Sequence, residues 1–445
     1  MLSSGAGNVV VRGETVPRAA LARGSTPPVV PFAFVEDIET IPAPGAEAVG
    51  QNILREDVPL PACVLRAGAL DRNLAEFQRF SQASGVLLCP HAKTSMSPAL
   101  FGRQLATGAW GLTFANGHQL RVARRHGVPR VFYANQLVGA ADIGYVCDEL
   151  RRDPGFDFYC LVDSVAGVRL LAERVARAAP GRPLNVLVEG GLAGGRCGVR
   201  SVGQAVAVAE AVRAAGAHLA LVGVEGFEGL VRNEDAGRRA ADVLVFLSFL
   251  VEMAETLDAR GLFDAGEVLL TAGGSAFYDL VAGALGAARL SRPSRVILRS
   301  GCYLTQDWGL YDRLAADLRA RTGPAAPDLE PAIEVWTQVL SVPEPELVIL
   351  SAGRRDFGQD AGNPVALTHV RRGSAERRPL RGSGWRMAAA SDQHAHMAAP
   401  PGHGVEVGDL VALGPSHPCT TFDKWRVIYL VDDEYTITEA VPTCF

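Results

Sequence analysis

The chain has 445 residues, of which 48% are hydrophobic and 20% charged, and its formal net charge is −5 at pH 7. Because a single hydrophobic core rarely grows past roughly 250–300 residues, this length predicts two domains. The sequence has no basic run interleaved with aromatic residues, which argues against a nucleic-acid partner, and no apolar run of the roughly 18–20 residues that a membrane span needs. The stretch up to about Pro31 lacks the apolar segment of a signal peptide.

Residues 1–55 are predicted to be an irregular N-terminal extension. Proline-rich patches at 27–31 and 42–44 interrupt this segment, and proline lacks the amide hydrogen that helices and sheets use. The extension carries no motif to which we attach a function.

Short apolar runs alternate with amphipathic stretches between about residues 60 and 300, which predicts a parallel sheet covered by helices. The strand-like runs are Ala62–Arg66, Val86–Cys89, Gly111–Ala115, Arg130–Ala134, Phe158–Val162, Leu184–Glu189, Leu219–Glu225, Val268–Ala272 and Val296–Arg299. The clearest helical stretches are Leu70–Ser84, Val165–Ala179, Gly203–Ala215 and Ala240–Ala259. This number of runs fits a closed (β/α)₈ TIM-type barrel with one lead-in strand, which we place at residues 56–325. No G-x-G-x-x-G motif follows the first strand, so a dinucleotide-binding fold is not supported.

The pattern changes at about residue 330, where helical periodicity fades. Short β-type runs separated by Pro and Gly follow, namely Ile333–Val339, Leu347–Leu350, Asp409–Leu413, Trp425–Val431 and Thr436–Ala440. The Arg- and Gly-rich segment Arg371–Ser383 is predicted to be a loop. Residues 326–445 are therefore predicted to form a mostly antiparallel β domain.

Polar and glycine residues follow the predicted barrel strands, and in such barrels the chemistry lies at the carboxyl ends of the strands. These residues are His91, Lys93, Asn116, Asn135, Gln136, Asp163, Glu189, Glu225, Gly273–Ser275 and Ser300. The strand ends therefore predict a functional rim.

Lys93 is the first candidate catalytic residue. Two of the 43 cationic residues are lysines, Lys93 and Lys424, and the others are arginines. A desolvated lysine amine can attack a carbonyl and form a Schiff base, which arginine cannot do. Lys93 follows a predicted strand, with His91 two residues before it. The alternative, a leftover surface lysine, fits Lys424 at least as well.

Gly273-Gly274-Ser275 lies between a predicted strand and a helical stretch, where backbone amides can bind phosphate. An ordinary strand–helix turn is the alternative. Tyr303, after the next strand, could hydrogen-bond a phosphate or an aromatic ring, although taken alone it also fits a core or interface residue.

His417 and Cys419 are candidate metal ligands. They stand two apart, so an extended backbone points both to one side. Imidazole and thiolate together suit Zn²⁺, and two protein ligands leave positions open for water and substrate. The alternative is a capping histidine beside a buried cysteine. Asp392-Gln393-His394-Ala395-His396 is a second, weaker candidate cluster.

The eight cysteines are scattered, lie mostly in apolar runs and include no C-x-x-C pair. Reduced core cysteines have this distribution, and a disulfide framework does not. We therefore expect a cytoplasmic protein.

The segments Pro90–Thr94 and Pro415–Cys419 resemble those of fold-type III pyridoxal-phosphate (PLP) enzymes. The nearest group is the D-serine dehydratase and D-threonine aldolase branch of the alanine-racemase-like superfamily, in particular its amino-acid deaminases. The resemblance runs from about Val58 to the C-terminus. It departs from the family at Cys89, where relatives often have Arg, and at Ser95-Met96, where they often have His-Lys.

The resemblance implies roles for particular residues. Lys93 would carry PLP and, with His91, act in catalysis. Arg196, Tyr303 and the turn Gly273–Ser275 would bind the cofactor. His417 and Cys419 would hold a divalent metal, expected to be Zn²⁺. These implied residues are Lys93, His91, Arg196, Gly273, Gly274, Ser275, Tyr303, His417 and Cys419.

The resemblance also implies an activity. We expect a lyase that eliminates water and then ammonia from a D-β-hydroxy amino acid and yields a 2-oxo acid. D-threonine aldolases tend to carry His with Asp at the metal pair, so Cys419 favours the dehydratase. The alternatives are aldol cleavage to glycine and an aldehyde, a racemase, for which no second base is evident, and a non-catalytic PLP-binding protein. A homodimer is also expected, because the β domain of such folds usually completes the neighbouring subunit's site.

Overall fold

The computed structural model describes residues 8–11, 14–17 and 45–445. The chain divides into two compact units, Met1–Pro42 and Ala43–Phe445. In the first unit, β1 (Asn8–Val11) pairs antiparallel with β2 (Glu14–Pro17). The sequence analysis predicted irregular structure here and missed this pair, although its valines favour strands. Neither Pro-rich patch lies within the described residues.

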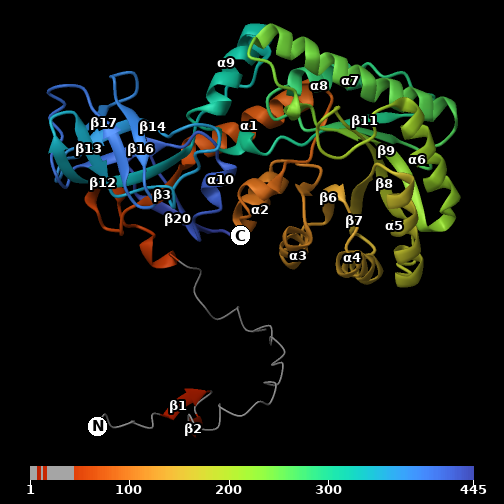
Figure 1. The fold of residues 1–445 in the computed structure, drawn as a ribbon, viewed down its shortest axis with the longest axis horizontal. Helices are drawn as coiled ribbons and strands as arrows, with labels where there is room; N and C mark the ends of the chain where they lie inside the picture. Colours follow the sequence, from red (N-terminus) through yellow and green to blue (C-terminus); the bar gives the residue numbers. More distant parts are fainter. Residues whose placement is uncertain (1–7, 12–13, 18–44) are drawn as a thin grey trace, which may run out of the picture. The chain divides into compact units, whose positions relative to one another are not determined.

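The second unit contains a sheet of eight parallel strands in the order β4-β11-β10-β9-β8-β7-β6-β5 (Figure 1). Their bounds are β4 (Leu87–Leu88), β5 (Leu112–Phe114), β6 (Arg130–Gln136), β7 (Asp157–Val162), β8 (Leu184–Gly190), β9 (Leu219–Gly226), β10 (Val268–Ala272) and β11 (Ser294–Leu298). A parallel bridge between His91 and Thr113 brings the two edge strands together. The sheet is therefore curled into the predicted barrel.

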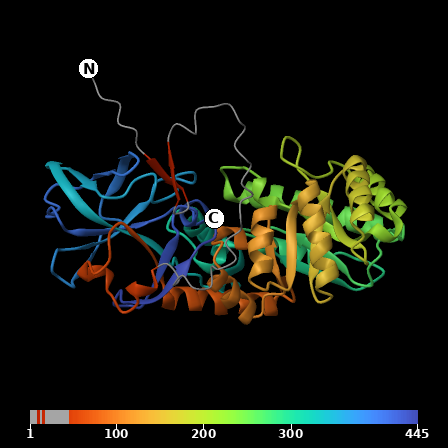
Figure 2. The ribbon, with the colours of Figure 1, turned by 90° about the horizontal axis from the view of Figure 1, so that it is seen from below.

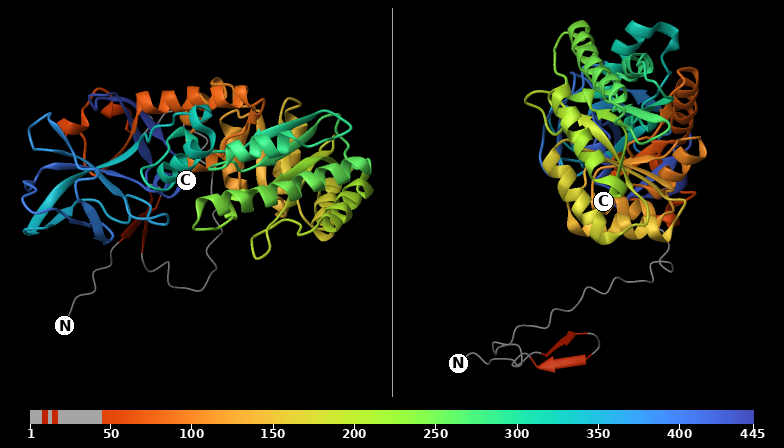
Figure 3. Two further views of the ribbon diagram at one scale, coloured as in Figure 1. Left: turned by 90° about the horizontal axis from the view of Figure 1, so that it is seen from above. Right: turned by 90° about the vertical axis from the view of Figure 1, so that its right-hand side faces the viewer.

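Helices form the outer layer of the barrel (Figure 3). They are α1 (Ala67–Ala83), α2 (Pro98–Ala106), α3 (Gly117–Arg125), α4 (Ala140–Arg152), α5 (Val165–Ala178), α6 (Val202–Ala214), α7 (Ala236–Ala259), α8 (Tyr278–Gly286) and α9 (Leu310–Thr322). Asn116, Ser164, Ser201 and Asp235 begin four of these helices by accepting a hydrogen bond from a first-turn amide. Such caps satisfy amides that have no partner inside the helix.

The inside of the barrel is filled by apolar side chains. These buried residues come from different strands and are Cys89, Phe132, Leu161, Leu187, Val222, Leu269 and Ile297. The inside of the barrel is thus a packed core.

A second sheet lies beside the barrel (Figures 1 and 2). Its strands are β3 (Ala62–Arg66), β12 (Ile333–Glu344), β13 (Leu347–Leu350), β14 (Val365–Val370), β15 (Arg377–Pro379), β16 (Arg386–Ala390), β17 (Ala395–Ala398), β18 (Leu410–Gly414), β19 (Val427–Val431) and β20 (Ile437–Pro442). Their pairing is antiparallel except between β3 and β19. The predicted lead-in strand is β3, and it belongs to this sheet.

The remaining elements are short helices. They are η3 (Ala46–Ala48), η4 (Ile53–Arg55), η5 (Ala92–Thr94), η6 (Gly216–His218), η7 (Glu228–Leu230), η8 (Cys302–Leu304), η9 (Gly323–Ala325) and α10 (Cys419–Phe422). None of the helices in the described residues is both long and apolar enough to cross a membrane.

The predicted fold class, a TIM-type barrel followed by a mostly antiparallel β domain, is confirmed. Every predicted barrel run contains or overlaps a strand. The predicted loop Arg371–Ser383 is wrong in part, because it contains β15, an exposed strand paired with the end of β14. The domain limits 56–325 and 326–445 stay predictions.

Candidate active site and metal cluster

The loop that carries Lys93 is fixed between two barrel strands. Lys93 lies on η5 (Ala92–Thr94), just after β4. The amide of His91 donates to the Arg299 carbonyl over 3.2 Å, and the amide of Thr113 donates to the Pro90 carbonyl over 2.8 Å. Strand ends on both sides therefore hold the half-buried Lys93 at the mouth of the barrel.

A cavity of about 200 Å³ opens at Lys93. Since one water needs roughly 10–15 Å³ by this measure, there is room for a small organic group. The cavity is lined by His91, Lys93, Ala115, Ala134, Asn135, Gln136, Glu189, Arg196, Cys197, Phe227, Gly273, Ser275 and Arg299. Most of these residues lie at or just after the ends of barrel strands, so several of the predicted rim residues line one cavity.

His91 offers an uncharged ring to this cavity. Burial, with the positive charges of Lys93 and Arg299, lowers the pKa of His91 well below its ordinary value. Its Nδ1 is buried and has no hydrogen-bond partner within the described residues. A neutral imidazole with a free nitrogen can donate or accept one hydrogen bond, according to its tautomer.

Two buried carboxyl groups give the cavity wall its electrostatic character. Burial, together with the charge of Glu225, raises the pKa of Glu189 to about 7, although Gln136 donates a hydrogen bond to its carboxyl. Glu225 is paired with the buried guanidinium of Arg299. Arg299 also donates to the Gly226 carbonyl over 2.8 Å and to the Thr271 hydroxyl over 3.1 Å. The ion pair thus fixes one wall, while Glu189 can hold a proton near neutral pH.

The turn Gly273-Gly274-Ser275 follows β10 and lies partly on the cavity surface. Gly273 and Ser275 line the cavity. The amide of Gly274, which has φ +64°, donates to the buried Glu228 carboxyl over 2.7 Å. Gly273 and Ser275 therefore face the cavity, whereas the Gly274 amide already has a protein acceptor.

The other two predicted cofactor residues lie in different settings. Arg196 lines the cavity, with its guanidinium 4.6 Å from the centre of the Phe227 ring. Tyr303 lines a narrower neighbouring cavity that also contains Ser275. The Tyr303 ring stacks on Phe77 at 4.4 Å, and its hydroxyl accepts a hydrogen bond from Gln104 over 3.4 Å. The structure thus brings Arg196 to Lys93 but leaves Tyr303 in an aromatic cluster.

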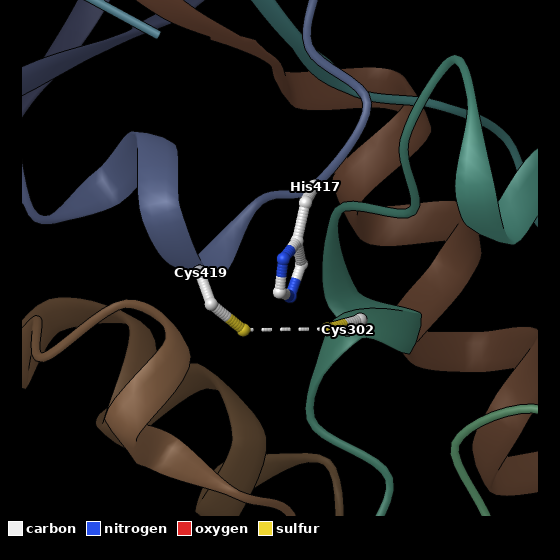
Figure 4. A group of neighbouring side chains, drawn as sticks. All are labelled: Cys302, His417 and Cys419. Carbon is white, nitrogen blue, oxygen red and sulfur yellow. Dashed lines mark hydrogen bonds between the residues drawn. The ribbon is translucent and has the colours of Figure 1, made fainter. Parts of the chain in front are cut away.

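The predicted metal pair is brought together and gains a third member. Among the described residues, Cys302, His417 and Cys419 form a group whose potential ligand atoms all lie within 4.8 Å of one another (Figure 4). The Sγ atoms of Cys302 and Cys419 are 3.6 Å apart. Cys302 is on η8, Cys419 is the first residue of α10, and His417 lies two residues before that helix.

Neighbouring groups orient this cluster. The Nδ1 atom of His417 is 2.6 Å from the Asp360 carboxylate, which also accepts a hydrogen bond from Thr420. Burial lowers the pKa of His417, but Cys419 and Asp360 outweigh it and raise the pKa to about 9. The hydrogen bond from Cys302 and the charge of His417 lower the pKa of Cys419 well below its ordinary value, against the effect of burial. Because Nδ1 of His417 faces Asp360, Nε2 is the nitrogen left for a metal.

The metal cluster lies beside the Lys93 loop. The hydroxyl of Thr94, the residue after Lys93, is 3.2 Å from Sγ of Cys419. A Cβ atom on Gly301, the residue before Cys302, would lie 2.5 Å from the His91 carbonyl oxygen. The loops carrying the amine and the thiols are thus in direct contact.

The alternative cluster does not join this site. Asp392 forms an exposed ion pair with Arg355 at 3.3 Å. His396 lies on β17, where it pairs with Ile349 and Ala389 of the adjoining strands. These residues belong to the second sheet, away from the group of potential metal ligands described above.

Comparisons with known proteins show what the chain is similar to. Residues 332–431 match the family model "Putative serine dehydratase domain". The sequence is 26% identical over 402 residues to a D-threonine aldolase of Arthrobacter sp, covering 89% of this chain and 95% of that protein. It is 34% identical over 112 residues to a D-threo-3-hydroxyaspartate dehydratase of Delftia sp. (strain HT23), covering 25% and 29%. The crystal structure of D-threonine aldolase from Filomicrobium marinum matches with a TM-score of 0.69 and 25% identity, covering 87% and 95%.

Residues 332–431 thus match a serine dehydratase domain, and the chain is similar to a D-threonine aldolase over most of its length. This confirms the predicted resemblance, including the alanine-racemase-like fold. Four residues at this site were not singled out in the sequence, namely Arg299, Cys302, Glu228 and Asp360. Arg299 and Cys302 flank the predicted strand end at Ser300, which was a usable signal. Asp360 stands in a Gly-rich stretch without any motif, so only the fold reveals it.

Proposed function

We propose that this protein is a lyase that uses PLP and a divalent metal to remove water from a D-β-hydroxy amino acid, releasing ammonia and a 2-oxo acid. The observation that carries the proposal is the contact of Thr94 with Cys419. It sets a metal-binding cluster beside a lysine amine that faces a polar cavity. The named relatives, which include a D-threonine aldolase and a D-threo-3-hydroxyaspartate dehydratase, support a lyase.

The residues of the cavity fit PLP. Lys93 supplies the amine for the cofactor aldehyde, while Gly273, Ser275 and Arg196 offer polar groups for its phosphate and ring substituents. The buried Nδ1 atom of His91, which has no partner among the described residues, is the kind of polar atom that a bound group would satisfy. When bound, PLP supplies an electron sink that stabilises negative charge on the substrate Cα. The hydrogen bond from the Gly274 amide to the Glu228 carboxyl stabilises the conformation of this turn.

The chain's own groups then carry the proton chemistry. The Lys93 amine, when free, would act as the base that removes the Cα proton of the substrate. The uncharged ring of His91 lies beside this amine and adds no positive charge that would oppose its protonation. Arg299 is held in the cavity wall by its buried ion pair with Glu225.

The cluster at His417 and Cys419 fits a divalent metal, because imidazole and thiolate are a donor set that Zn²⁺ prefers. A bound ion supplies Lewis acidity at a β-hydroxyl, which helps a poor leaving group to depart. Asp360 holds the His417 ring so that Nε2 faces the thiols. The contact with Thr94 keeps this cluster next to the amine.

Aldol cleavage to glycine and an aldehyde is the second candidate, favoured by the match to D-threonine aldolase over most of both chains. Incubation with D-threonine separates the two reactions. A dehydratase yields 2-oxobutyrate and ammonia, whereas an aldolase yields acetaldehyde and glycine. Acetaldehyde as the main product, with no 2-oxo acid, would overturn the dehydratase assignment.

Lys93→Arg tests the cofactor site, and Lys424→Arg is its matched control because it changes the chain's other lysine. We expect borohydride reduction of the wild type to fix the cofactor on the peptide containing Lys93. Lys93→Arg should lose the visible cofactor absorbance and all turnover, while Lys424→Arg keeps both. A colourless wild-type protein that turns over without added PLP would contradict the proposal.

The assembly and the compartment are also proposals. A homodimer predicts twice the chain mass of 47.0 kDa in light scattering, and a monomer with full activity would refute it. A cytoplasmic location is supported by the free, mostly buried cysteines. It is tested by cell fractionation.

A further inference from the structure

We propose that Cys302 is a third protein ligand of the metal, so that the site is a Cys₂His centre with one open position. This inference rests on the metal dependence stated under Proposed function and adds a residue to it. It starts from the grouping of Cys302 with His417 and Cys419, whose ligand atoms come within 4.8 Å of one another.

The sulfur positions fit a shared tetrahedral ion. At the usual Zn–S bond length of about 2.3 Å, two thiolates on a tetrahedral zinc lie about 3.8 Å apart. The Sγ atoms of Cys302 and Cys419 are 3.6 Å apart. A disulfide would require about 2.05 Å. The present spacing thus needs little adjustment to admit zinc, and it is far from a covalent S–S contact.

Cys302 is held in place for this role. Only 4% of the residue is exposed, and its carbonyl accepts a hydrogen bond from the Gln306 amide over 2.7 Å. Because Gly301 packs against His91, the start of η8 cannot move away from the Lys93 loop without losing that contact. Figure 4 shows the His417 ring directed toward the two sulfur atoms. A ligand that is already ordered loses little entropy when the ion binds.

A Cys₂His set has consequences for the metal and for the substrate. Two thiolates balance the charge of Zn²⁺, which reduces the cost of placing the ion in a buried site. Soft sulfur ligands also favour zinc over Mg²⁺ and Mn²⁺, which prefer oxygen. Three protein ligands leave the fourth tetrahedral position for a water or a substrate hydroxyl, the arrangement of catalytic zinc sites.

The test uses the PLP-loaded protein in which Co²⁺ replaces the native metal. Thiolate–cobalt bonds absorb in the near ultraviolet, and the intensity grows with the number of sulfur ligands. We expect Cys302→Ser to lose roughly half of this intensity and to bind Zn²⁺ at least about tenfold more weakly in competition with a chromophoric chelator. Cys147→Ser, which changes a buried cysteine on α4, should leave both quantities unchanged.

X-ray absorption of the zinc-loaded wild type avoids any substitution, should Cys302→Ser fail to fold. Two sulfur atoms in the first shell of the zinc support the proposal, and one sulfur atom overturns it. Unchanged cobalt absorbance and zinc affinity in a folded Cys302→Ser protein would also overturn it. That result leaves the proposed lyase standing, as shown by 2-oxo acid formation. A wild type that binds no metal and is fully active would instead refute the metal dependence itself.

Discussion

The carboxyl group of Glu189 provides a direct test of the electrostatics of the cavity. It is buried next to Glu225, and burial with this repulsion raises its pKa from 4.5 to about 7. The folded protein therefore keeps a proton that the unfolded chain has already released. The contribution of protonated Glu189 to the free energy of unfolding is fully present below pH 4.5 and is lost as pH rises through about 7. Over that interval the loss amounts to about 3 kcal/mol, at about 1.4 kcal/mol for each pKa unit.

Glu189→Gln removes the ionisation and keeps an oxygen that can accept the hydrogen bond from Gln136. The difference in free energy of unfolding, wild type minus variant, should fall by up to about 3 kcal/mol between pH 4.5 and pH 8. Urea unfolding of the cofactor-free protein at several pH values, followed by tryptophan fluorescence, measures this difference. Glu173→Gln, on the exposed face of α5, is the control and should show no such trend.

A difference that stays constant from pH 5 to pH 8 would refute the reasoning. It would mean that Glu189 is already ionised in the folded protein at pH 5, as an exposed carboxyl is. A difference that grows with pH would show that a positive charge, such as that of Arg196, controls Glu189 instead of burial.

Three other substitutions test contacts around the candidate site. Arg299→Leu leaves Glu225 buried without its partner, and we expect about 3–5 kcal/mol of destabilisation in urea unfolding; adding Glu225→Gln should recover part of it, and full stability in the single variant would refute the pairing. Gly301→Ala forces its Cβ against the His91 carbonyl, so we expect about 1–3 kcal/mol of destabilisation and weaker cofactor absorbance; unchanged values of both would contradict the close contact. Phe77→Ala leaves a cavity in place of a fully buried ring and should lower the free energy of unfolding by about 3–5 kcal/mol in the same assay. A change below about 1 kcal/mol would show that neighbouring side chains move into the cavity.

The barrel strands were predictable because each is a short run of buried branched residues, a pattern that the parallel sheet requires. The strands β15 and β16 were missed for a physical reason. Strand β16 (Arg386–Ala390) is mostly exposed and rich in alanine, and β15 (Arg377–Pro379) is exposed throughout. Such segments owe their strand structure to the neighbours they pair with, and intrinsic propensity contributes little.

In the candidate site, some features follow from the neighbouring sequence, whereas others depend on residues far away in the chain. Lys93 and the turn at Gly273 follow strands, so the rule that chemistry gathers at strand ends finds both. Gly274 has the expected turn geometry, but its amide is taken by Glu228, which lies 46 residues earlier in the chain. The availability of a backbone amide depends on such distant partners, and a sequence pattern does not reveal them.

Cys302 and Tyr303 show that residue type alone does not decide which of two neighbouring residues lies at the candidate metal site. The two are neighbours on η8, and a 3₁₀ helix turns by about a third of a revolution for each residue. The Tyr303 side chain therefore packs on Phe77, while that of Cys302 meets Cys419, 117 residues further along the chain. The sequence analysis chose the tyrosine because its hydroxyl suits a phosphate. The choice between neighbours depends on which side of the short helix faces the β domain, and that is set by the packing of Gly301 against the Lys93 loop.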